Sequence, residues 1–181
     1  NNYDWHSALR VAEELESLDF AWFEAPLPDY DVDGYRELTR RVHIPVLPSG
    51  NWIQDLPSLA AALETHAWKA ARTDVTVCGG LTPACKAMAL VGAAGLNCEL
   101  MSWGNTLVST ANLHLMLAFP HCTYYEQPMP YEAYEYGMKE VIRTQADGYV
   151  YAPRGPGLGL EIDREAMEAA TIHAFDTGKT P

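Results

Sequence analysis

Two kinds of apolar pattern alternate along this chain, and the alternation restricts the folds that it can adopt. Short apolar runs typical of buried strands occur at residues 18–24, 44–50, 68–77, 96–103 and 121–126. Helical apolar spacing occurs before and between these runs, at residues 8–15, 32–42, 56–63, 82–94 and 110–117. Strands and helices that follow one another in this way indicate parallel βαβ units, hence an α/β fold.

The ends of the expected strands are evenly spaced. They are closed by Glu24, Asn51, Asp74, Met101 and Glu126, which are 27, 23, 27 and 25 residues apart in turn. A (β/α)8 barrel of roughly 250 residues uses about 30 residues for each unit, so these steps fit such a barrel with short loops. The carboxyl ends of barrel strands surround one mouth, where active sites lie. The spacing therefore predicts that these five side chains converge.

The helix signals also predict where some helices begin. Asp4 or Ser7 suits the cap of the first helix. Thr82 and Pro83 suit the cap and first turn of the helix at 82–94. The pattern changes after Glu126, and we expect two parts: a β/α barrel portion of about five strands at 1–129, and a C-terminal loop and helix segment at 130–181. The second part is expected to pack back on the barrel or on a capping domain.

Charge and composition narrow the possible functions. A net charge of -12 over 181 residues argues against nucleic-acid binding, which needs a basic face. No long uncharged apolar run suggests a membrane span, and four cysteines without a CxxC pair suit a reducing compartment, so we expect a cytoplasmic protein. Residues 155–159, GPGLG, lack the Lys-Ser/Thr of a phosphate-binding loop. Zinc and serine-hydrolase motifs are also missing from the sequence.

Several short motifs at the strand ends resemble one family, in order and with matching spacing. These are FEAP at 23–26, PSGNW at 48–52, TDVTVCGGLT at 73–82, HCTYYEQ at 121–127 and PGLGLEID at 156–163. Together they resemble the C-terminal barrel domain of the enolase superfamily, in its mandelate racemase and muconate lactonizing enzyme-like branch. The resemblance covers nearly the whole chain. It implies a (β/α)7β barrel of the TIM type, of which this chain would hold strands four to eight.

The resemblance also implies a chemistry. In this family one divalent cation, usually Mg²⁺ with Mn²⁺ as a substitute, binds the substrate's carboxylate. A base then removes the proton from the adjacent carbon, and the metal stabilises the enediolate. Glu24 matches the second metal ligand, and Asn51 stands where the third is most often Glu. Asp74 matches the aspartate of a catalytic His-Asp dyad, Met101 stands near the place of the dyad histidine and would line the substrate pocket, and Glu126 matches an acid that contacts the substrate.

Other parts of that machinery are expected upstream of Asn1. These are the first metal ligand, a Lys-x-Lys base motif and the α+β capping domain. We therefore expect this chain to belong to a longer enzyme, to need its own upstream segment for activity, and to form a homo-oligomer.

The most favoured function is an acid-sugar dehydratase that removes an α-proton and eliminates water. Racemisation needs proton-transfer groups on both faces of the intermediate, and Met101 removes the usual one. A racemase or epimerase, and a barrel that binds a carboxylate without catalysis, remain alternatives. Simpler roles also remain open for single residues: Glu24 could cap a helix or pair with Arg36, Asn51 could be a turn residue, and Glu126 could be structural.

Overall fold

The computed structural model describes residues 3–51 and 55–174. In this part the strands are β1 (Phe23–Glu24), β2 (Val46–Leu47), β3 (Ala70–Thr73) and β4 (Asn97–Leu100). The helices are α1 (Trp5–Ser17), α2 (Val32–Arg41), α3 (Leu56–Glu64), α4 (Leu81–Ala93), α5 (Thr106–Ala118) and α6 (Arg164–Ala170), with a 3-10 helix η1 at Tyr131–Ala133. The predicted alternation of strands and helices is confirmed as far as α5.

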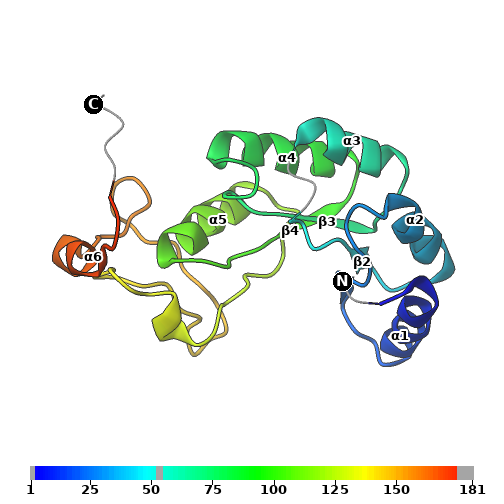
Figure 1. The fold of residues 1–181 in the computed structure, drawn as a ribbon, viewed down its shortest axis with the longest axis horizontal. Coiled ribbons are helices and arrows are strands. Elements are labelled where there is room, and N and C mark those ends of the chain that lie inside the picture. Colours follow the sequence, from blue (N-terminus) through cyan, green and yellow to red (C-terminus); the bar gives the residue numbers. More distant parts are fainter. Residues whose placement is uncertain (1–2, 52–54, 175–181) are drawn as a thin grey trace.

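The strands run parallel and follow one another in chain order. β1 pairs with β2, and β3 pairs with β4. The N–H of Lys69, just before β3, donates to the carbonyl oxygen of Val46 in β2 at 3.3 Å, which links the two pairs. Helices α3 and α4 lie along one side of β3 and β4 (Figure 1). This arrangement is a portion of a TIM-type barrel, as the sequence predicts.

The strand predicted at 121–126 does not form. The segment begins beside β4, because the N–H of Cys98 donates to the carbonyl oxygen of His121 at 2.8 Å. After His121, the buried carboxylate of Glu99 accepts hydrogen bonds that a neighbouring strand would otherwise accept. It accepts the N–H groups of Thr123 and Tyr124, at 3.2 and 3.3 Å, and the Thr123 hydroxyl at 2.7 Å. A side chain therefore holds these backbone donors where a ladder was expected.

Aspartates define the starts of several helices, and glycine defines one. Asp4 caps α1 by accepting a hydrogen bond from the N–H of Ser7, which decides between the two predicted caps. Helix α4 begins at Leu81 after Gly80, so the predicted Thr82 cap is wrong. Gly80 has φ of 124°, a backbone conformation that favours glycine. The turn that leads into the helix therefore lies at Gly80, before Thr82.

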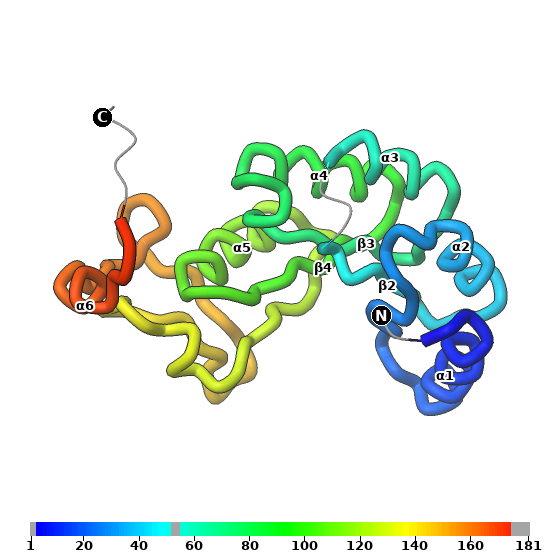
Figure 2. The backbone as a smooth tube through the Cα atoms, in the orientation of Figure 1, coloured from blue at the N-terminus to red at the C-terminus, as the bar shows by residue number. Residues whose placement is uncertain are grey.

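The chain after the last strand takes a different course. Figure 2 shows its yellow to red part leaving the strands and carrying α6 to the end of the molecule opposite α1. An isolated bridge between Met138 and Ile162 closes this part on itself, and the N–H of Thr106 in α5 donates to the carbonyl oxygen of Tyr134 at 2.9 Å. The domain division at residue 129 stays a prediction. None of the helices within residues 3–51 and 55–174 has the length and apolarity needed to span a membrane.

The core lies between the helices and the strands, and Tyr35 ties α2 to the loop after β1. The Tyr35 side chain is fully buried, and its hydroxyl donates to the carbonyl oxygen of Leu27 at 2.7 Å. A Tyr35→Phe variant should lose about 1–2 kcal/mol of unfolding free energy, because that carbonyl is left without its partner. Urea unfolding measures the loss. Tyr136→Phe, at a side chain 58% exposed, should change stability by less than about 0.5 kcal/mol; equal effects of the two variants would contradict the assignment.

Candidate active site

A polar cavity of about 350 Å³ lies at the carboxyl ends of the strands. Its walls come from all four strand ends: Glu24, Ser49, Asn51, Arg72, Asp74, Thr76, Val77, Met101 and Trp103. Four of the five predicted site residues therefore share one pocket. The fifth, Glu126, is not part of the lining, but it contacts Arg72, which is. A second cavity of about 320 Å³, between the strands and helices α3 and α4, is lined mainly by apolar side chains.

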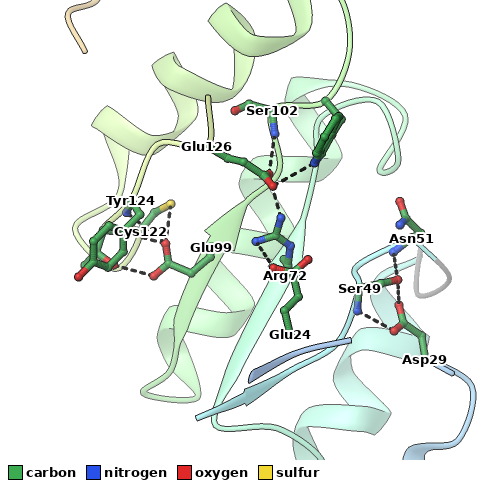
Figure 3. Close-up of polar contacts among 12 residues, drawn as sticks. Glu24, Asp29, Ser49, Asn51, Arg72, Glu99, Ser102, Cys122, Tyr124 and Glu126 are labelled. Carbon is green, nitrogen blue, oxygen red and sulfur yellow. Dashed lines mark hydrogen bonds and ion pairs between the residues drawn. The ribbon is translucent and has the colours of Figure 1, made fainter. Parts of the chain in front are cut away.

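Arg72 of β3 lies at the centre of the site, between two carboxylates (Figure 3). Its Nη1 atom is 3.2 Å from Oε2 of Glu24, and its Nη2 atom is 2.8 Å from Oε2 of Glu126. Only 4% of the Arg72 side chain is exposed. Its Nε–H is buried and has no hydrogen-bond partner within the described residues. One buried guanidinium thus joins the end of β1 to the segment that follows β4.

Glu24 is the more accessible of these two acids, with 38% of its side chain exposed. Burial raises the pKa of its carboxyl, the charge of Arg72 lowers it, and nearby Glu126 raises it again, with a net rise. The simpler roles considered for Glu24 do not occur here. Helix α2 is capped by Asp31, and Arg36 pairs with Asp33 at 2.9 Å.

Glu126 is held by three donors. Besides Arg72, the Nε1–H of Trp103 donates to its Oε1 at 3.0 Å, and the N–H of Ser102 donates to its Oε2 at 3.3 Å. Each carboxylate oxygen therefore already accepts a bond from the protein. The structural role considered from the sequence accounts for these contacts, and the predicted substrate contact stays a prediction.

Asp74 follows β3 directly and is buried, with 2% of the residue exposed. Its Oδ1 accepts the N–H of Thr76 at 2.6 Å and contacts the Thr76 hydroxyl, which shapes the turn after the strand. Its Oδ2 accepts the side-chain amide of Asn112, in α5, at 2.9 Å. Asp74 thus anchors the strand end to a helix. Its predicted catalytic role is not tested by these contacts.

Met101 and Asn51 complete the pocket wall. Met101 is 6% exposed, and its thioether cannot transfer a proton. Asn51 lies in the turn after Gly50, whose φ is 78°. That turn is fixed by a buried carboxylate, because Asp29 accepts the N–H and the hydroxyl of Ser49 at 2.7 and 2.8 Å. In Figure 3 this Asp29–Ser49–Asn51 group lies beside the Arg72 group.

The donor atoms suit part of a magnesium site. Glu24 and Asn51 bring a carboxylate and an amide to the same pocket, and hard oxygen ligands are those that Mg²⁺ prefers. Within residues 3–51 and 55–174 there is no group of three or more His, Cys, Asp or Glu side chains that could hold a metal ion. Glu24 and Asn51 would therefore supply two ligands of a larger set, and the positive charge of Arg72 lies beside Glu24.

Sequence patterns alone did not single out Arg72. Its signal was a charged residue inside an apolar run, two residues before Asp74. Successive side chains in a strand alternate between its two faces, so residues two positions apart share a face. Because Asp74 was expected at the pocket, Arg72 could have been expected on the same face. Asp29 carried no comparable signal, because its role depends on Ser49, which lies 20 residues away in the chain.

This chain spans less than half the length of the following relatives and solved structures that it matches. A solved structure from Pseudovibrio sp., assigned to the mandelate racemase/muconate lactonizing enzyme group, superposes with a TM-score of 0.92 at 39% identity, covering 94% of this chain and 46% of that one. D-glucarate dehydratase from Agrobacterium tumefaciens, solved with magnesium, gives a TM-score of 0.78 at 31% identity, with 92% and 44% covered. Muconate cycloisomerase 1 from Rhodococcus opacus is 28% identical over 171 residues, 93% of this chain and 45% of its own length.

The family comparison covers nearly all of the chain. The model of the family described as Enolase C-terminal domain-like matches residues 1–166. Other relatives include acid-sugar dehydratases and a racemase, so the matching proteins are enzymes of more than one reaction type. The resemblance stated from the strand-end motifs is confirmed. With matching parallel strands, matching order and a matching family model, this chain belongs to the enolase C-terminal domain-like family.

Proposed function

We propose that this protein is a Mg²⁺-dependent lyase that removes water from a hydroxy-carboxylate of the acid-sugar type. The observation that carries the proposal is the meeting of Glu24, Asn51, Asp74 and Met101 around one polar pocket at the strand ends. A D-galactonate dehydratase family member at 25% identity and a D-xylonate dehydratase at 26% identity support the reaction class. The chain spans less than half of their length, so the activity is proposed for the natural full-length protein.

The residues of this chain would bind and orient the reactants. Glu24 and Asn51 would hold the cation. When bound, the cation would engage the substrate's carboxylate and make removal of the neighbouring proton easier. The hydroxyl and amide groups of Ser49, Asn51 and Thr76 offer hydrogen-bond partners for a polyhydroxy substrate. The base that takes the α-proton would come from a part of the protein outside this chain.

Elimination suits this pocket better than racemisation. A racemase needs a proton-transfer group on each face of the planar intermediate. Met101 offers none, while Asp74 is buried and bonded to Thr76 and Asn112. Loss of the β-hydroxyl needs one base and assistance to the leaving group. The product is an enol that rearranges to a 2-oxo-3-deoxy acid.

The test is a screen of aldonic and aldaric acids with the full-length protein and Mg²⁺. The expected product is a 2-oxo acid, detected as its semicarbazone and formed only when the metal is present. Runs in ²H₂O measure exchange of the α-proton at the same time. Exchange without a 2-oxo product would overturn elimination in favour of the racemase or epimerase.

A protein that binds carboxylates without catalysis is the second candidate. It is favoured by the engagement of Asp74 and both oxygens of Glu126 with protein donors, together with Met101 in the wall. Acid-sugar binding with neither product nor exchange is the result that would support it. We also propose a cytoplasmic homo-oligomer, with further copies of itself as partner, and the mass of the natural protein in solution measures that state.

A further inference from the structure

The guanidinium of Arg72 is positioned to act on the proposed cation site. Glu24, the proposed ligand, gives one carboxylate oxygen to Arg72 at 3.2 Å. Glu126, which comes from a distant part of the sequence, gives another at 2.8 Å. Two carboxylates and one guanidinium carry a net charge of about −1 when all three are ionised. Arg72 therefore removes half of the negative charge that these acids would otherwise offer to a cation.

Arg72 cannot make way for a cation by losing its proton, because a guanidinium stays charged in proteins. Its charge is also poorly screened, since only 4% of the side chain is exposed. A divalent cation on Glu24 would lie close to this positive group and be repelled by it. Glu126 offers the guanidinium a second partner, and Glu126 is itself fixed by Trp103 and Ser102. Arg72 can thus release Glu24 and keep one ion pair.

We propose that Arg72 is a positioning residue that competes with a divalent cation for Glu24 and thereby lowers the cation affinity of the pocket. Cation binding moves the guanidinium from a bridge between two acids to a pair with Glu126 alone. The inference rests on the proposed function only in taking Glu24 as a cation ligand. It assigns to Arg72 a role that the strand-end motifs do not contain.

The experiment is calorimetric titration of the full-length protein with MgCl₂, without substrate. The Arg72→Met variant should bind Mg²⁺ at least tenfold more tightly than wild type. In the double variant Arg72→Met/Glu126→Gln the net charge of the group equals that of wild type, yet the guanidinium no longer competes for Glu24. Its affinity should still exceed that of wild type. An affinity equal to wild type would mean that total charge alone matters and would overturn the competition.

The direction of the effect separates this role from simple structural support. Loss of a merely structural contact misplaces Glu24 and weakens Mg²⁺ binding, so weaker or unchanged binding by a folded Arg72→Met protein overturns the proposal. Circular dichroism and thermal melting establish folding. If Arg72→Met does not fold, Arg72→Gln replaces it, because its neutral amide can still donate to a carboxylate; tighter binding is again expected.

The Glu24→Gln variant distinguishes the two proposals. If Glu24→Gln loses Mg²⁺ binding while Arg72→Met gains none, only the role of Arg72 fails. If Glu24→Gln binds Mg²⁺ as wild type does, the ligand assignment in the proposed function fails, and the role of Arg72 fails with it.

Discussion

Replacing Glu24 with glutamine should weaken Mg²⁺ binding by the full-length protein about a hundredfold or more and reduce turnover by at least as much. Glutamine keeps the size of the side chain and one oxygen but removes the negative charge that attracts the cation. A hundredfold loss corresponds to about 2.7 kcal/mol of binding free energy. The pocket position of Glu24, with 38% of its side chain exposed, leaves it accessible to the cation.

Titration calorimetry and the 2-oxo acid assay measure the two effects. Glu37→Gln is the matched control, because Glu37 forms an exposed pair with Arg41 on α2 and lies outside the pocket lining. That variant should behave as wild type in both measurements. If Glu24→Gln retains wild-type metal affinity, the pocket is not the cation site.

Replacing Asn112 with aspartate should lower the unfolding free energy by about 3–5 kcal/mol. Asn112 is fully buried, its amide donates to Oδ2 of Asp74 at 2.9 Å, and its oxygen accepts the N–H of Val75 at 3.1 Å. The variant replaces the amide that donates to Asp74 with a second carboxylate, so two like charges would be buried side by side. Lowering the pH should recover part of the stability, because a proton on either carboxyl restores a donor.

Chemical unfolding at neutral and mildly acidic pH measures this prediction. Asn112→Ala should cost less, because it removes two hydrogen bonds without adding a charge. Asn97→Asp, at an exposed position at the start of β4, is the matched control and should change stability by less than about 0.5 kcal/mol. Equal losses from Asn112→Asp and Asn97→Asp would mean that Asn112 does not support the carboxylate of Asp74.

Local sequence patterns were sufficient for the order of the helices and of the parallel strands β1 to β4. Apolar spacing and the Asp4 cap depend on residues only a few positions apart in the chain, so the sequence alone shows which residues take part. The alternation of strand and helix then leaves few arrangements besides a parallel sheet or barrel. For the same reason the regular spacing of strand ends placed Glu24, Asn51, Asp74 and Met101 around one pocket.

Tertiary structure decided what each of these side chains contacts. The segment at 121–126 has strand-like composition, but the carboxylate of Glu99 takes its backbone donors. Arg72 bridges Glu24 and Glu126, although 48 and 54 residues separate it from them in the chain. Sequence patterns report periodicity along one element, whereas an ion pair or a buried hydrogen bond depends on where separate elements meet. The sequence by itself therefore determined the fold class and the pocket, and only the folded chain decided the partners and charge balance within it.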